Sequence, residues 1–195
     1  MLKFAKIIAL GLFMSFTTYN AQAPEWNIDN NHTSISFEVN HFFTPVTGSF
    51  KDFEGNLSFD AENLEGSSAS FTVQIASVET DSDKRNGHLQ SADFFDAKKF
   101  PEMKFTSSSF SQDGDNYVLN GKLTIRDVTK EVKIPVKLLG LGDHPMKKGK
   151  LITAMRAEFS LNRNDYGVGT GSWAATAVVG DEVKVSVLLE ANRNK

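Results

Sequence analysis

The chain has 195 residues, with 21 basic and 24 acidic side chains, a formal net charge of −3 and no cysteine. This mild acidity argues against a nucleic-acid partner, which calls for a basic face, and the lack of thiols excludes disulfides, thiolate metal sites and cysteine nucleophiles. A chain of this length fits one domain that buries its own core.

Residues 1–23 predict a secretory signal peptide. Lys3 and Lys6 precede an apolar run at 7–16, and Ala21-Gln22-Ala23 provides the small-x-small pattern of a cleavage site. A membrane anchor is the alternative, but the run is only about half of the roughly 20 residues that a spanning helix needs. The mature domain is therefore expected at 24–195, without a transmembrane segment, in the periplasm or secreted.

Most of the predicted mature domain shows the alternation of apolar and polar residues that is typical of half-buried strands. Clear alternation covers 35–40, 71–75, 117–125, 132–138 and 183–191, and weaker strands are expected at 50–59, 103–106 and 157–161. The apolar parity changes within 50–59, which a bulge near Gly55 would explain, and Pro135 indicates an edge or a bulge. About eight antiparallel strands predict a sandwich or an up-and-down barrel.

The segment 83–100 breaks this alternation and predicts a short helical connection across one end of the barrel. Ser91 is expected to cap the helix through the acidic residues that follow, and Pro101 ends the segment. Phe94 and Phe95 are expected to point inward, where they either line a ligand site or fill the core.

Phenylalanine is frequent at the inward-facing strand positions: Phe37, Phe50, Phe59, Phe71, Phe105 and Phe159. An eight-stranded barrel is just wide enough to be filled by side chains or to hold one small ligand. Aromatic rings can line a cavity for an alkyl or isoprenoid chain, or they can simply fill the core.

No catalytic or metal motif is recognisable in the sequence. The four histidines show no ligand spacing, since His32 and His41 lie too far apart along one strand to share an ion. The glycines of 167–171 open no βαβ unit and are interpreted as a barrel-rim loop.

Polar residues gather in two short segments, 85–88 and 163–165. If these segments meet at the barrel mouth, Arg85 and Arg163 would contact an anionic or polar head group. The alternative is that they form ion pairs within loops, Arg163 with Asp165 among them.

Five ordered blocks resemble the YceI-like family: IDNNHTSISFEVNH (28–41), VTGSFKDFEG (46–55), RNGHLQS with DFFD and FP (85–101), GKLTIRDVTK (121–130) and FSLNRNDYG (159–167). Two positions depart from the family pattern. Asn86 replaces an aspartate that would pair with Arg85 or orient His88, and Asp127 replaces a turn glycine.

The resemblance implies an all-β, lipocalin-like, antiparallel eight-stranded barrel with an internal apolar tunnel. It implies binding of a polyisoprenoid-type or other amphiphilic lipid, with no cofactor, no metal and no catalysis. The expected polar contacts at the mouth are Arg85, His88 and Arg163. The expected apolar contacts are Phe37, Val39, Phe50, Phe59, Phe71, Val73, Phe94, Phe95, Phe105, Leu123 and Phe159.

Two other functions remain open from the sequence. One is an enzyme acting on a lipid-like substrate, with His32, His41 or His88 as the general base. The other is an interaction module whose barrel is fully packed and whose surface binds a partner. A homodimer is compatible with an exposed barrel rim.

Overall fold

The computed structural model describes residues 22–169 and 171–195, so the predicted leader lies outside the described residues apart from Gln22 and Ala23. Within the described ranges β-strands are the predominant secondary structure. The strands are β1 (Glu25–Ile28), β2 (Ser34–His41), β3 (Thr44–Phe50), β4 (Phe53–Ser58), β5 (Ser68–Gln74), β6 (Val78–Glu79), β7 (Glu102–Asp113), β8 (Asn116–Ile125), β9 (Val128–Asp143), β10 (Lys150–Asn162) and β11 (Val179–Asn194). The helices are α1 (Asp83–Gln90) and the short 3-10 segments η1 (Ile75–Ser77), η2 (Arg163–Tyr166) and η3 (Gly171–Ala174).

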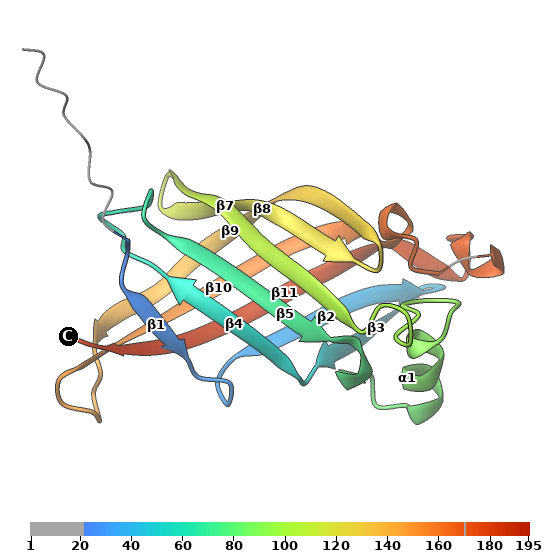
Figure 1. Ribbon diagram of the computed structural model, residues 1–195. Coiled ribbons are helices and arrows are strands. Elements are labelled where there is room, and N and C mark those ends of the chain that lie inside the picture. The colour runs from blue at the N-terminus through green and yellow to red at the C-terminus, as the bar shows by residue number, and fades with distance from the viewer. Residues whose placement is uncertain (1–21, 170) are drawn as a thin grey trace, which may run out of the picture.

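The strands form a closed, antiparallel up-and-down barrel (Figure 1). The long strand β11 pairs with β1 through Ala191 and Ile28 and then with β2 through Leu188 and Ser34, so β1 and β2 act as one interrupted strand. In the same way β3 continues into β4 and β5 into β6. Counted like this, eight strands close the barrel, and the predicted fold is confirmed.

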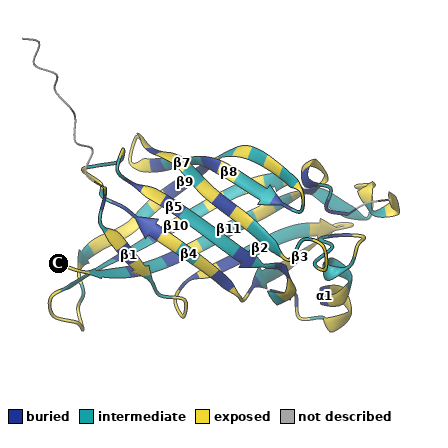
Figure 2. Cartoon of the chain, viewed as in Figure 1, coloured by how far each residue is buried: buried dark blue, intermediate teal, exposed yellow. Residues whose placement is uncertain are grey.

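Buried and exposed residues alternate along the strands, as the sequence predicts (Figure 2). No helix in the described part of the chain is both long and apolar enough to span a bilayer.

The segment 50–59 is not a single bulged strand, so that prediction was wrong. β3 ends at the buried Phe50 and β4 begins at the buried Phe53, and the two residues between them change the parity. Gly55 pairs in regular register with Phe71, and a Cβ at Gly55 would lie only 2.7 Å from a Phe71 ring carbon. This glycine therefore makes room for the Phe71 ring.

Pro135 lies where one side of β9 loses its neighbour. The β9–β10 pairing ends at Val136 and Ala157, so the residues of β9 before this pair have no partner in β10. A proline donates no hydrogen bond to a ladder. Its position at this local edge agrees with the expectation from the sequence.

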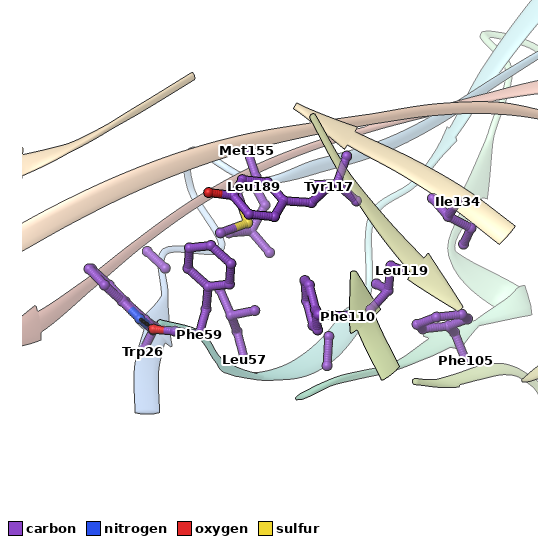
Figure 3. Packing of buried hydrophobic residues seen from close by; sticks show 13 residues of the cluster. Trp26, Leu57, Phe59, Phe105, Phe110, Tyr117, Leu119, Ile134, Met155 and Leu189 are labelled. Atoms are coloured by element: carbon purple, nitrogen blue, oxygen red, sulfur yellow. Dashed lines mark hydrogen bonds between the residues drawn. The ribbon is translucent and has the colours of Figure 1, made fainter. Parts of the chain in front are cut away.

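One end of the barrel is filled by a dense apolar cluster (Figure 3). Phe59 is 1% exposed, and its ring lies 5.3 Å from that of Tyr117 and 5.7 Å from that of Phe110, centroid to centroid. The indole Nε1 of Trp26 donates to the Phe59 carbonyl oxygen at 2.9 Å. Phe59, expected on a ligand wall, is a core residue of this filled end.

Helix α1 lies at the opposite end of the barrel (Figure 1). Its N-cap is Ser82, whose Oγ accepts from the Arg85 backbone N–H at 3.4 Å, and Ser91 is the C-cap. The predicted role of Ser91 as N-cap was wrong. Its hydroxyl donates to the His88 carbonyl at 2.7 Å and so binds a free carbonyl at the end of the helix.

Candidate functional site: an apolar cavity in the barrel

The half of the barrel nearer α1 encloses a cavity of about 220 Å³. An engineered apolar cavity of roughly 150 Å³ stays dry and binds benzene, so this space is far larger than a packing defect. Its wall comes from both the strands and the segment after α1, and it includes seven phenylalanines: Phe37, Phe50, Phe71, Phe94, Phe95, Phe105 and Phe159.

Eleven of the fourteen predicted site residues lie on the cavity wall: Phe37, Val39, Phe50, Phe71, Val73, Phe94, Phe95, Phe105, Leu123, Phe159 and Arg163. The other three, Phe59, Arg85 and His88, are not part of it. The inward strand parity thus places its phenylalanines on the apolar wall except Phe59, and of the three predicted polar residues only Arg163 lies on the wall.

Glycines in the neighbouring strand make room for two of the wall rings. Gly48 is the β-sheet partner of Phe37, and a Cβ there would lie 2.8 Å from the ring carbon Cε1. A Cβ on Gly121 would lie 2.7 Å from the Phe105 ring. Real Cβ atoms do not approach this closely, so each ring lies across a strand where only glycine fits.

Phe94 and Phe95 are at once core residues and cavity wall. The Phe95 ring meets that of Phe50 edge-on at 6.0 Å. Phe94 is buried in a cluster with Tyr166 and Val168, and both residues also line the cavity. The sequence leaves two interpretations of these rings open, core filling and wall, and each ring both packs in the core and lines the cavity.

Arg163 is buried at 3% exposure, lines the cavity and binds backbone oxygens at the start of β11. Its Nε donates to the Gly180 carbonyl at 2.8 Å, and its Nη2 donates to that of Val179 at 2.7 Å. Burial lowers the pKa of the guanidinium from its ordinary value, with a smaller opposing effect of Asp181. The geometry shows Arg163 fastening the loop after β10 to the start of β11.

The expected ion pair of Arg163 with Asp165 does not form. Asp165 lies 2.9 Å from the Lys130 Nζ instead. Arg163 points into the protein and Asp165 points outward, because residues two positions apart in the short η2 helix face different sides.

Arg85 and His88 are satisfied locally and do not meet Arg163 at the mouth. The Arg85 Nε donates to the Thr80 Oγ1 at 2.9 Å, and its Nη2 donates to the Thr80 carbonyl. The His88 Nε2 lies 3.0 Å from the Asp93 Oδ2, and its ring meets that of Trp173 edge-on at 4.9 Å. The polar cluster that the sequence predicts is therefore two separate loop networks.

Arg126 joins two loops next to cavity-lining residues, a role that sequence reasoning missed. Its Nη1 donates to the Phe94 carbonyl at 2.9 Å and to that of Gly167, so it joins the segment after α1 to the loop after η2. It has a left-handed φ of 55° in the turn between β8 and β9, where the sequence pointed to Asp127. Nothing in the sequence distinguishes Arg126 from an exposed turn residue.

Further wall residues could have been found from strand parity. Val183, Val185 and Val187 share the inward face of β11, and Leu161 follows Phe159 two positions along β10. The remaining wall residues not predicted from the sequence are Ile35, Ser36, Leu89, Met103, Lys104, Leu119, Ile125, Ile134, Ala157, Tyr166, Val168 and Val179.

His32 forms a polar group with two carboxylates outside the cavity. Its Nδ1 lies 3.1 Å from the Asp29 Oδ2 and 3.8 Å from the Glu190 Oε1. The Asp29 carboxylate raises the pKa of His32, and His32 in turn lowers the pKa of Asp29. The three side chains offer one nitrogen and two oxygen ligands that could hold a cation, an arrangement that a search for histidine pairs does not find.

The whole barrel matches one protein family. The model of the YceI-like domain matches residues 26–191. Curated relatives include the Protein YceI of Salmonella arizonae and that of Salmonella paratyphi B. Each is 34% identical over 183 residues, which is 92% of this chain and 93% of the relative.

Solved structures share the fold. BcnA of Burkholderia cenocepacia is 29% identical with a TM-score of 0.77, over 85% of this chain and 99% of that one. The YCEI protein of Campylobacter jejuni is 30% identical with a TM-score of 0.71, over 78% and 87% of the two chains. A polyisoprenoid binding domain from Saccharophagus degradans is 14% identical with a TM-score of 0.60, over 85% and 97%, a likeness of fold alone.

Proposed function

The chain belongs to the YceI-like domain family, and from this premise we propose that it is a lipid-binding protein rather than an enzyme. Its ligand is a long apolar or amphiphilic lipid of the polyisoprenoid type, held inside the barrel. The observation that carries the proposal is the cavity of about 220 Å³ walled by seven phenylalanines.

The chemistry of the wall supports an apolar ligand. Each methylene group moved from water into such a cavity contributes about 0.8 kcal/mol, so about ten buried methylenes supply the gross free energy of a tight complex. A solved barrel of the same fold is described as a polyisoprenoid binding domain, which agrees with this class of ligand.

The titratable wall residues favour binding over catalysis. Among the described residues of the wall these are Lys104, Arg163 and Tyr166. Burial raises the pKa of the Tyr166 phenol from its ordinary value, which disfavours the phenolate that a general base would need. His32, His41 and His88, the bases that the enzymatic alternative needs, are not part of the wall.

The proposal includes export of the protein to the periplasm. The basic and apolar pattern of residues 1–23 supports a signal peptide, and the proposed place of action is the periplasm.

Mass spectrometry of an organic extract tests the proposal. The chain is expressed from its own leader, purified from its native compartment without detergent, and compared with the variant Ala157→Trp. Ala157 lies on the wall, so the indole fills the cavity. We expect a near-stoichiometric long-chain lipid in the parent protein and at least about tenfold less in the variant, because roughly two buried methylenes are worth a factor of ten.

The matched control is Ser160→Trp on the same strand. Ser160 is exposed and not part of the cavity wall, so this variant should retain the lipid. An empty extract from a folded, monodisperse parent protein would contradict the proposal, as would equal lipid content in Ala157→Trp and the parent.

A further inference from the structure

The tip of the β2–β3 hairpin carries two adjacent phenylalanines that point into solvent. His41 pairs with Thr44, so Phe42 and Phe43 form the whole two-residue loop. Phe43 is 100% exposed and Phe42 is 57% exposed. Elsewhere in the described chain the large apolar side chain of comparable exposure is Met146, at 89%.

The Phe42 ring meets the His41 ring edge-on at 4.5 Å but stays 57% exposed, and Phe43 is fully exposed, so packing in the fold accounts for little of either ring. Phe42 has a left-handed φ of 54°, and its N–H donates to the Val178 carbonyl at 2.9 Å. A two-residue hairpin loop with positive φ at its first position favours glycine there, and a bulky side chain is disfavoured. Phenylalanine at this position therefore works against the fold, which points to a role outside the fold.

The surroundings of the tip are suited to a neutral apolar phase. Between Glu38 and Lys51 the sequence contains no Asp, Glu, Lys or Arg, so the hairpin itself carries no permanently charged side chain. Asp181 and Glu182 lie beside the hairpin in β11, between the residues that pair with His41 and Val39. These acidic groups favour a zwitterionic surface over an anionic one.

The hairpin lies at the cavity end of the barrel. Val39 and Val179, at the base of the hairpin and beside it, line the cavity. The tip and α1 lie together at the end opposite the C-terminus, away from the filled cluster (Figure 1). A contact made by the tip therefore brings the cavity end of the barrel to whatever the tip touches.

We propose that Phe42 and Phe43 insert into the interface of a zwitterionic lipid bilayer and dock the cavity end of the barrel on it. Exposed aromatic residues on an otherwise uncharged segment bind membranes by burying apolar area at the level of the head groups. The inference uses the proposed lipid cargo only to explain why the mouth approaches a membrane, and docking itself does not depend on a bound ligand.

Co-flotation with phosphatidylcholine vesicles tests the docking. The parent protein is compared with Phe42→Gly, with Phe43→Ser, with the double variant and with Met146→Ser, whose side chain is equally apolar but lies in the β9–β10 turn. We expect the double variant to lose at least about tenfold in vesicle partitioning, and Met146→Ser to bind like the parent. Added salt should leave binding unchanged, because the contact is apolar.

Thermal unfolding of Phe42→Gly gives the second readout. The melting temperature should stay the same or rise, because glycine fits the turn, while vesicle binding falls. A general loss of folding would lower both together and would overturn the assignment of the ring to membrane contact.

Further outcomes distinguish the possible binding partners of the hairpin tip. Failure of the parent to float with vesicles would overturn the docking proposal, as would an equal loss in Met146→Ser. Self-association of the parent that disappears in the double variant, without vesicle binding, would assign the tip to a second copy of the chain. Ala157→Trp should dock normally, so failure of the lipid-cargo proposal and failure of docking are distinguishable.

Discussion

Asn86 organises the turn before α1 through three hydrogen bonds. Its Oδ1 accepts from the backbone N–H of Thr80 at 2.9 Å and from the hydroxyl of Thr80 at 2.7 Å. Its amide group donates to the Glu79 Oε1 at 3.1 Å, which lowers the pKa of the Glu79 carboxyl. The amide is therefore complementary to a neighbouring carboxylate, and an aspartate would bring two like charges together.

Asn86→Asp should destabilise the protein at neutral pH and less so in acid. In this variant the new carboxylate lies beside that of Glu79, and the repulsion raises the pKa of one of the two above its unfolded value. The loss in free energy of unfolding is therefore full above the raised pKa and diminishes as the pH falls below it. Chemical denaturation at about pH 7 and pH 5 measures this. Asn86→Ala leaves the Thr80 donors without their acceptor and should cost about 2 kcal/mol at both pH values. Identical losses for Asn86→Asp at the two pH values would contradict the prediction.

The His32 ring should titrate above the ordinary histidine value. The hydrogen bond to Asp29 favours the charged imidazole. Its stabilising effect is full below the unfolded pKa of about 6.5 and is lost as the pH rises through the raised folded value. The contribution of Asp29, whose pKa is lowered, is lost as the pH falls through its folded value.

NMR titration of the imidazole checks this directly. Asp29→Asn should move the pKa of His32 downward, because it removes the carboxylate that raises it. A His32 titration that does not respond to Asp29→Asn would show that the pair does not form in solution.

At the scale of the elements, the contact between a wall ring and a glycine couples neighbouring strands. The Phe37 ring on β2 lies across Gly48 on β3, where a Cβ would collide with both the ring and the Thr80 methyl group. Gly48→Ala should therefore destabilise the protein by about 2 kcal/mol through overpacking. The midpoint of denaturant unfolding measures the loss.

Gly140→Ala provides the control for this substitution. Gly140 is also a strand glycine, but a Cβ there would meet no heavy atom within 4 Å, so its stability should change by less than about 0.5 kcal/mol. Equal effects of the two substitutions would show that strand flexibility, and not the ring contact, is responsible.

The strands and their inward faces could be predicted because alternation is a local signal. Phe37, Phe71 and Phe159 all occupy the wall positions that their parity indicates. The same signal cannot tell a filled section of the barrel from a hollow one, and so Phe59 was assigned to the wrong part.

The hydrogen bonds of Arg163 and Arg126 could not be predicted, because they join distant loops through backbone oxygens. Arg163 binds carbonyls of Val179 and Gly180, and Arg126 binds those of Phe94 and Gly167. Backbone acceptors are the same at every residue, so the sequence holds no trace of which ones an arginine will reach. The side-chain carboxylates that the sequence does show drew attention to the wrong partner, Asp165.

At the scale of the whole molecule, the barrel has two unlike halves. One half is closed by the cluster around Trp26, Phe59 and Tyr117, and the other encloses the cavity. A lipid in this cavity has its apolar chain toward the filled half and its polar head toward α1 and the loop after β10, because a buried head group would lose its hydration. The two unlike halves would thereby fix the direction in which the proposed lipid lies.

The filled end also sets the kinetics of exchange. A second lipid cannot enter from behind and push the first one out, so the occupant has to leave before a successor arrives. With a fluorescent lipid analogue in stopped flow, the rate of replacement should equal the dissociation rate constant and stay constant as the competitor concentration rises. A rate that grows in proportion to the competitor would require a passage through the Trp26 cluster. If the protein carries a lipid as proposed, its rate of delivery would then be set by the lifetime of the complex and would not rise with the concentration of free lipid.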